Sequence, residues 1–176
     1  MRKLGMDELN RKSVDEFRSA EKIPVIALLE NIRSAYNVGS VFRTADAFLI
    51  EAVFITGYTA KPPHKEITKT ALGAQDSVDW KYFENTKLAI EQLRQNKYKV
   101  FAVEQVADSI LLEKLSELDI DKIAFIFGNE VSGINHETLS LCDGCIEIPQ
   151  FGMKHSLNIS VAAGIVLWEA VKAKSF

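Results

Sequence analysis

Long apolar segments and an excess of positive charge are both missing from this chain of 176 residues. The apolar run Val161–Trp168 is far too short to span a bilayer, and charged residues follow it closely. The first residues, MRKLGMDELNRK, are polar and charged, unlike the apolar core of a signal peptide. These absences predict a cytoplasmic protein.

Cysteine is scarce: Cys142 and Cys145 form a single C-x-x-C pair. A structural zinc ion needs four ligands, and His136 could be a third but no fourth is evident. A thioredoxin-like dithiol follows a strand and opens a helix, whereas this pair precedes the strand-like residues 146–148. We therefore expect two reduced, partly buried thiols and no metal.

The composition is that of one globular domain, with 47% hydrophobic and 26% charged residues. These values exclude disordered and collagen-like chains. The formal net charge is −3, whereas nucleic-acid-binding proteins more often carry a basic excess. A local basic patch would suffice for RNA, so the charge does not exclude that partner.

Strand-like apolar runs alternate with helical patterns along the whole chain. The predicted strands are residues 23–30, 52–57, 77–83, 99–104, 122–128 and 145–149. The predicted helices are residues 6–20, 40–48, 65–72, 86–96, 114–118, 135–141 and 158–174, with a loop over 31–39. This alternation predicts an α/β fold with a mostly parallel sheet flanked by helices. We expect a helical extension over 1–22 and a catalytic domain over 23–176.

Common nucleotide-binding and hydrolase motifs are absent from the sequence. There is no G-x-G-x-x-G, which argues against a nucleotide-binding oxidoreductase, and no G-x-S-x-G. Gly128 and Gly133 have the glycine spacing of a P-loop, but Ile134-Asn135 stands where Lys-Ser/Thr should be.

Polar and glycine residues gather directly after three strong strands. The three junctions are Glu30-Asn31-Ile32-Arg33 leading to Asn37-Val38-Gly39-Ser40, then Gly128-Asn129-Glu130, then Ile148-Pro149-Gln150-Phe151-Gly152 leading to Ser156-Leu157-Asn158. Ligands of open α/β sheets bind beyond the carboxyl ends of the strands. The three junctions are therefore expected to form one site.

The segments NVGSVFRTADAF, FIFGNEVSGI and IPQFGMKHSLNISVAAGI resemble, in order, the three motifs of the SpoU/TrmH family of RNA 2′-O-methyltransferases, within the SPOUT superfamily. The resemblance runs from about residue 23 to 172. It implies a C-terminal deep trefoil knot, S-adenosylmethionine as cofactor, and a homodimer. It also implies methylation of a ribose 2′-hydroxyl in RNA.

Many members of this family carry an additional N-terminal RNA-binding domain, and a leader of about twenty residues is too short to be one. That favours tRNA as substrate, with rRNA as the alternative. A non-catalytic RNA-binding module of the same fold is a third hypothesis. The presence of Asn37, Arg43, Glu130, Ser156 and Asn158 together speaks against this third hypothesis, since RNA binding alone does not require all five.

By resemblance, Arg43 is the catalytic arginine, six residues after Asn37. An arginine is almost always protonated, so electrostatic activation of the hydroxyl is easier to defend than a general-base role. The alternative for Arg43 is a helix-surface charge or a salt bridge to Asp46. Asn37 could also cap the helix that leads to Arg43.

The resemblance gives Glu130 a part in shaping the catalytic pocket across the dimer, and Ser156 and Asn158 a part in placing the ribose or holding Arg43 and Glu130. The alternative for Glu130 is a carboxylate at a helix N-terminus. Either Ser156 or Asn158 is expected to cap the last helix.

Cofactor and RNA contacts also follow from the resemblance and from charge. Gly128, Ile148 and Leu157 would contact the cofactor, largely through their backbones, although the core is an alternative place for the two apolar side chains. The candidate RNA contacts are Arg33, Lys61, His64, Lys65, Lys69 and Lys154, with His155 beside them. A solvated face is an equal alternative for Lys61, Lys65 and Lys69.

The last predicted helix is apolar on all sides over Val161–Trp168. Such a helix must be covered on more than one side. In a small domain, part of that cover would come from a second subunit.

Overall fold

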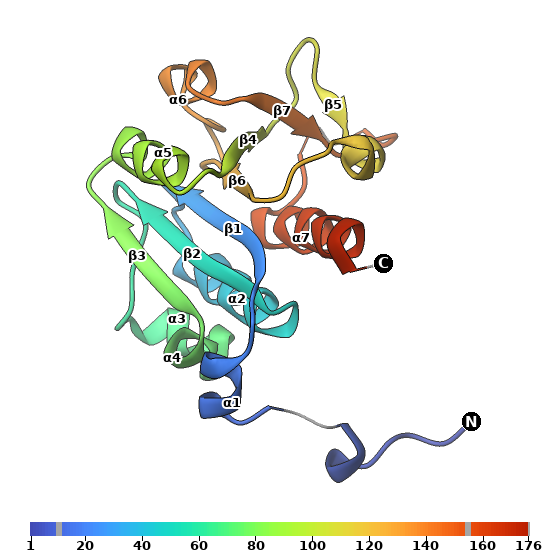
Figure 1. The fold of residues 1–176 in the computed structure, drawn as a ribbon. Helices are drawn as coiled ribbons and strands as arrows, with labels where there is room; N and C mark the ends of the chain where they lie inside the picture. The colour runs from blue at the N-terminus through green and yellow to red at the C-terminus, as the bar shows by residue number, and fades with distance from the viewer. Residues whose placement is uncertain (10–11, 154–155, 176) are drawn as a thin grey trace.

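The computed structural model describes residues 1–9, 12–153 and 156–175. One sheet has the strand order β3-β2-β1-β6-β4-β7-β5 (Figure 1). Its strands are β1 (Ile23–Glu30), β2 (Ile50–Thr56), β3 (Asp79–Phe83), β4 (Lys99–Val103), β5 (Ile110–Leu111), β6 (Ile123–Phe127) and β7 (Gly144–Glu147). Every pairing between neighbouring strands is parallel, which confirms the predicted α/β class.

Helices cover both faces of this sheet. They are α1 (Val14–Ser19), α2 (Ala35–Ala47), α3 (Lys65–Ala71), α4 (Ala74–Ser77), α5 (Thr86–Gln95), α6 (His136–Ser140) and α7 (Ile159–Ser175), with the 3₁₀ helices η1 (Met6–Leu9) and η2 (Leu112–Glu117). The buried residues of α2 and α7 belong to one hydrophobic cluster, and those of α5 belong to another on the opposite face (Figure 1).

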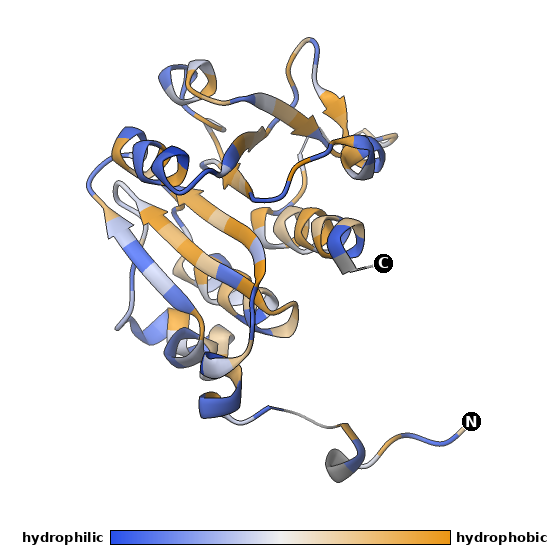
Figure 2. Ribbon diagram, viewed as in Figure 1, coloured by the Kyte–Doolittle hydropathy of each residue, from blue (hydrophilic) through white to orange (hydrophobic). Residues whose placement is uncertain are grey.

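The uninterrupted apolar run of β1 is explained by these two clusters. Val25, Ala27 and Leu29 pack in the cluster of α2 and α7. Ile26 and Leu28 alternate with them and pack in the cluster of α5. A strand covered on both faces has no hydrophilic side, as expected for a central parallel strand. The edge strand β3 is mostly exposed and is hydrophilic over much of its length (Figure 2).

Helix α2 begins earlier than predicted. Residues 35–39 are helical rather than part of a loop, and Ser34 is the N-cap, its side chain accepting from the backbone N–H of Asn37. The predicted capping role of Asn37 is therefore wrong. Gly39 lies inside α2, where it contacts α3. A Cβ at this position would lie 2.5 Å from the carbonyl oxygen of Ile67, so a glycine is needed for the two helices to pack this closely.

The leader is not one continuous helix over residues 6–20. Its second half, α1, starts after Ser13, which has extended backbone angles and forms a capping box with Glu16. The buried ring of Phe17 anchors α1 in the core. The short elements α4 and β5 were not predicted, since four and two residues are too few to show a period.

Helix α7 ends the described chain and packs on α2, β1 and η2. Its buried side includes Ala163, Val166, Leu167 and Ala170. Within residues 1–9, 12–153 and 156–175, no helix combines the length and the apolar character needed to cross a membrane.

Candidate active site

Glu130 lies at the centre of the polar residues beyond the carboxyl ends of β1 and β6. Its carboxylate accepts hydrogen bonds from the backbone N–H of Arg33 at 2.9 Å and of Ser34 at 3.2 Å. It also accepts from the side-chain amide of Asn37 at 2.9 Å. Glu130 thus receives the amides that open α2, although it is far from α2 in the sequence.

Glu130 is held in its ionised form. Burial opposes ionisation, but the hydrogen bonds from the Arg33 amide, the Asn37 side chain and the Ser34 amide outweigh it and keep the pKa of Glu130 below its ordinary value. Glu130 therefore serves as a fixed acceptor at neutral pH.

Asn158 extends this network to α7. Its side-chain nitrogen donates to Oδ1 of Asn37 at 3.2 Å, and its own Oδ1 accepts from the backbone N–H of Ser160 at 2.9 Å. The expectation that Ser156 or Asn158 caps the last helix is confirmed for Asn158. The side chain of Asn37 is thus hydrogen-bonded both to Glu130 and to Asn158, and it joins the three strand-end junctions.

Arg43 lies on α2 but outside the network. Six residues of an α-helix rotate the side chain by about 240°, so Arg43 does not point to the side on which Asn37 meets Glu130. Its side chain is exposed, and it makes no hydrogen bond or ion pair with the part of the chain that the structure describes. The alternative partner Asp46 instead accepts from Ser77 at 2.9 Å. The guanidinium is available to a group from outside its own chain.

A cavity of about 350 Å³ opens beside Glu130. It is lined by the ends of β4, β6 and β7 and by the segment that enters α7. The predicted cofactor residues Gly128, Ile148 and Leu157 all line it, as does Ser156. Their role in binding stays a prediction, but the sequence-distant junctions do surround one space.

Gly128 is required by the packing of its own chain. A Cβ on Gly128 would lie 2.5 Å from the carbonyl carbon of Gly133 and from the amide nitrogen of Ile134. Asn129 and Gly133 exchange backbone hydrogen bonds of 3.1 and 3.0 Å, which close the loop that follows β6. We call residues 129–133 the β6 loop. It forms one wall of the cavity.

Asn129 organises the β6 loop and was missed as a site residue. Its Oδ1 accepts from the backbone N–H groups of Val131 and Ser132, and its side-chain nitrogen donates to the Asn31 carbonyl at 2.9 Å and to the Tyr58 hydroxyl at 2.8 Å. The available signal was an asparagine directly after the predicted strand 122–128, because asparagine side chains readily bond the backbone of turns.

Glu30 is a second structural carboxylate that the sequence did not reveal. It is 3% exposed, accepts from the backbone N–H of Asn135 at 3.0 Å and from the Thr138 hydroxyl, and thereby caps α6. The signal was a single charged residue at the end of an apolar strand, because a buried carboxylate needs donors.

The candidate RNA contacts are exposed wherever the structure describes them. Arg33 precedes α2, and Lys61, His64, Lys65 and Lys69 lie in or just before α3. His64 has a structural role as well, since its Nδ1 accepts from the backbone N–H of Glu66 and caps α3. Lys154 and His155 lie outside the described residues.

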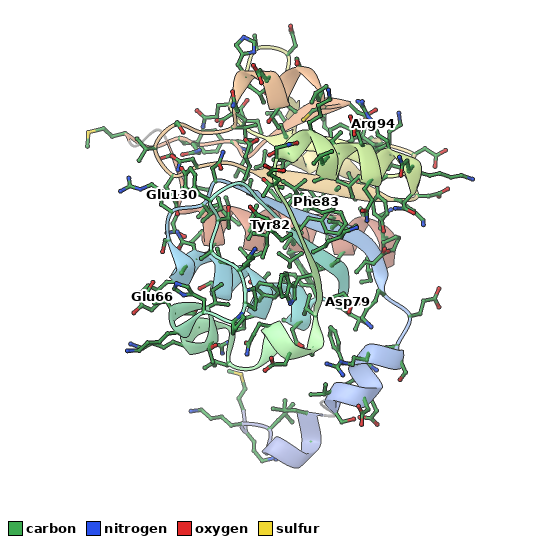
Figure 3. All side chains as sticks on the ribbon, turned by 90° about the vertical axis from the view of Figure 1, so that its left-hand side faces the viewer. Glu66, Asp79, Tyr82, Phe83, Arg94 and Glu130 are labelled. Carbon is green, nitrogen blue, oxygen red and sulfur yellow. The ribbon has the colours of Figure 1, made fainter. Side chains whose placement is uncertain are left out.

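Some of these lysines lie over aromatic rings. The ammonium of Lys61 is 3.7 Å from the ring centroid of Tyr82, and that of Lys69 is 5.7 Å from the ring of Tyr36. In the view from the β3 edge, Glu66 on α3 lies below Glu130, on the same side of the picture (Figure 3). Tyr36 stands directly before Asn37 in α2, so the ammonium of Lys69 lies near the start of that helix.

The cysteines are free and half-buried, as predicted. Burial raises the pKa of the Cys142 thiol to about 12, so at neutral pH it is a poor nucleophile. No group of three or more potential metal-ligating side chains occurs in the described part of the chain.

The chain is similar to known proteins over most of its length. The profile of the SpoU rRNA Methylase family matches residues 24–168. A tRNA (guanosine(18)-2′-O)-methyltransferase from Thermus thermophilus is 31% identical over 95% of this chain and 84% of its own length. A 23S rRNA (guanosine-2′-O-)-methyltransferase, RlmB, from Vibrio parahaemolyticus is 29% identical over 95% of this chain and 66% of its own.

A solved structure has the same fold and a bound ligand. An rRNA methyltransferase from Sinorhizobium meliloti with AdoMet bound superposes with a TM-score of 0.79 at 26% identity. The match covers 89% of this chain and 59% of that one. The chain thus spans about two thirds or less of the Vibrio and Sinorhizobium proteins, and most of the Thermus protein.

Proposed function

Because the chain belongs to the SpoU family of S-adenosylmethionine-dependent RNA 2′-O-methyltransferases, we propose that it methylates a ribose 2′-hydroxyl of a tRNA. The Thermus relative, which it matches over most of its length, modifies a guanosine of tRNA. The Vibrio relative modifies 23S rRNA, which makes rRNA the second candidate. An RNA substrate is consistent with a reaction in the cytoplasm.

The cavity beside Glu130 suits the cofactor. Its volume of about 350 Å³ lies in the range of small-molecule sites, and apolar side chains such as Ile148 and Leu157 alternate there with polar groups. Gly128 would let the cofactor approach the main chain closely, and Ile148 and Leu157 would contact its adenine. When bound, the cofactor supplies a methyl group already activated by a sulfonium.

The chain's own residues have to position and activate the hydroxyl. A hydroxyl is a weak nucleophile that loses its proton as it attacks, and the cationic Arg43 would stabilise the developing negative charge. Ser156 and Asn158 would orient the ribose. Asn37 and Glu130 hold Asn158 in place through the hydrogen-bonded chain, which is the observation that carries the proposal.

The proposed partner, besides RNA, is a second copy of the chain. Val161, Ile165 and Trp168 are 50%, 39% and 47% exposed and follow each other at helical spacing along α7. The ring of Phe48, which follows α2, lies 5.5 Å from that of Trp168 and extends this apolar face. A homodimer that buries it would give α7 the cover that its all-round apolar sequence requires.

The proposed topology of the C-terminal region is the deep trefoil knot. It is supported by the course of α7, which packs on β1 while Lys174 donates to the carbonyls of Ile120 and Asp121 at 2.6 and 2.7 Å. The last helix thus lies against the connection between η2 and β6. An experimental structure in which this connection does not enclose the later chain would contradict the knot.

The reaction is tested by mapping 2′-O-methylated nucleotides by mass spectrometry in RNA from the source strain and from a strain lacking the gene. We expect one modification to disappear from a tRNA and to return when purified protein and S-adenosylmethionine are added. Loss from 23S rRNA would instead select the second candidate. If neither RNA changes and calorimetry detects no cofactor binding, the chain is a non-catalytic RNA-binding module.

A further inference from the structure

We infer that the acidic lining of the cavity makes the protein prefer the positively charged methyl donor over its neutral product. The inference rests on the proposed function, because it concerns the same cavity. It adds two residues, Glu104 and Glu147, whose charge would set the ratio between donor and product affinities.

Three glutamates are among the residues that line the cavity: Glu104, Glu130 and Glu147. Glu104 follows β4 and accepts from the backbone N–H of Ile134 at 3.2 Å and of Gln105 at 3.0 Å. Glu147 ends β7 and accepts from the hydroxyl of Ser109 at 2.5 Å. The chain's own loops therefore hold all three carboxylates in place through neutral donors.

No cation of the described chain neutralises these groups. The described residues that line the cavity include no lysine, arginine or histidine. None of the ion pairs among the described residues involves Glu104, Glu130 or Glu147. The described lining of the cavity thus carries three glutamates and no basic side chain, and a ligand with positive charge would be attracted to it.

The two forms of the cofactor differ in this charge. S-adenosylmethionine carries a sulfonium, an ammonium and a carboxylate, for a net charge of +1. In the transfer the bond from sulfur to the methyl carbon breaks and its electron pair stays on sulfur. The methyl carbon bonds to the ribose oxygen, and the hydroxyl proton passes to water. S-adenosylhomocysteine, which remains, has no net charge.

A carboxylate in a partly enclosed cavity acts on this difference. The low dielectric of such a cavity strengthens the attraction between a carboxylate and a cationic ligand, and mobile ions weaken it. We therefore expect each of Glu104 and Glu147 to contribute about a five- to tenfold preference for the donor. The practical consequence would be product release without strong inhibition.

The experiment measures the dissociation constants of three ligands by calorimetry with the full chain. The ligands are S-adenosylmethionine, S-adenosylhomocysteine and sinefungin, whose amine places a positive charge where the sulfonium stands. The variants are Glu104→Gln and Glu147→Gln, which keep an oxygen to accept from Ile134 and Ser109. Glu91→Gln on the exposed side of α5 removes the same charge outside the cavity and serves as the matched control.

The expected result is that each cavity variant weakens S-adenosylmethionine and sinefungin about five- to tenfold and leaves S-adenosylhomocysteine nearly unchanged. The wild-type preference for the donor should also shrink as salt is raised, and Glu91→Gln should behave as wild type. Equal weakening of all three ligands would mean that the two glutamates only support the loop, and would overturn the inference, as would no change. If the wild type binds none of the ligands, the proposed function itself fails.

Discussion

The side-chain amide of Asn37 donates a hydrogen bond of 2.9 Å to Glu130, although 93 residues separate the two in the sequence. The oxygen of the same amide accepts from Asn158 at 3.2 Å. The nitrogen and the oxygen of one asparagine side chain thus connect the start of α2 with the β6 loop and with the cap of α7. Replacing any one of the three residues should change the position of the other two side chains.

Glu130→Gln should show how much the negative charge of Glu130 contributes to the stability of the protein. Because the pKa of Glu130 is lowered by folding, its ionised form stabilises the protein above the ordinary carboxyl range, and that stabilisation is lost as pH falls through the folded-state pKa. Urea unfolding should show the variant less stable by roughly 1 kcal/mol at pH 7, and the difference from wild type should shrink as pH falls through the folded-state pKa of Glu130. Equal stability at pH 7 would mean that the carboxylate charge contributes nothing.

Arg43→Ala should abolish methyl transfer without disturbing the fold. The side chain is exposed and has no hydrogen-bond partner in the described part of the chain, so its loss should leave the unfolding temperature and the affinity for S-adenosylmethionine nearly unchanged. Methyl transfer to RNA and calorimetry measure the two effects separately. Lost cofactor affinity would remove Arg43 from the catalytic role, and Arg94→Ala, on the other face of the sheet, is the control.

The sequence predicted the sheet better than the site. β1 was predicted at its observed bounds because a strand buried on both faces is an unbroken apolar run. The start of α2 was not, because Asn37 and Gly39 look like a cap and a helix breaker. Their real functions are to bond Glu130 and to admit α3. Such contacts depend on residues far along the chain, so no local pattern could reveal them.

The sequence motifs predicted some residues of the candidate site and missed others. The motifs placed Glu130, Ser156 and Asn158 at strand ends, and the structure brings these ends around one cavity. Glu30 and Asn129 were missed because they bond backbone groups far along the chain: Glu30 accepts from the N–H of Asn135, and the side-chain nitrogen of Asn129 donates to the carbonyl of Asn31. Backbone donors and acceptors leave no trace in the sequence.

Gly128→Ala should destabilise the β6 loop. The new Cβ would lie 2.5 Å from backbone atoms of Gly133 and Ile134, which no side-chain rotation can relieve. We expect a loss of roughly 1–3 kcal/mol in the free energy of unfolding and weaker binding of S-adenosylmethionine. Gly152→Ala is the matched control for stability, since its Cβ would meet no atom within 4 Å. Unchanged binding and stability in Gly128→Ala would contradict the observed close contact.

The basic residues around α3 should contribute to RNA affinity through phosphates. Combined replacement of Lys61, Lys65 and Lys69 by glutamine should weaken tRNA binding and lower the slope of log affinity against log salt by about 1 for each phosphate that a lysine no longer neutralises. Filter binding at several salt concentrations measures this slope. Lys87→Gln on α5, on the opposite face, should leave it unchanged. An unaltered slope in the triple variant would show that these lysines are only a solvated face.

Ile165→Glu should separate the proposed dimer. Ile165 lies between Val161 and Trp168 on the exposed side of α7, and burying an unpaired carboxylate between two such helices is strongly unfavourable. Because the side chain is 39% exposed in the single chain, the substitution should be tolerated by the fold of each subunit. Analytical ultracentrifugation at low micromolar concentration should show a dimer for wild type and a folded monomer for the variant. Leu88→Glu, at an exposed leucine of α5, should remain dimeric. A monomeric wild type would instead mean that α7 is left uncovered.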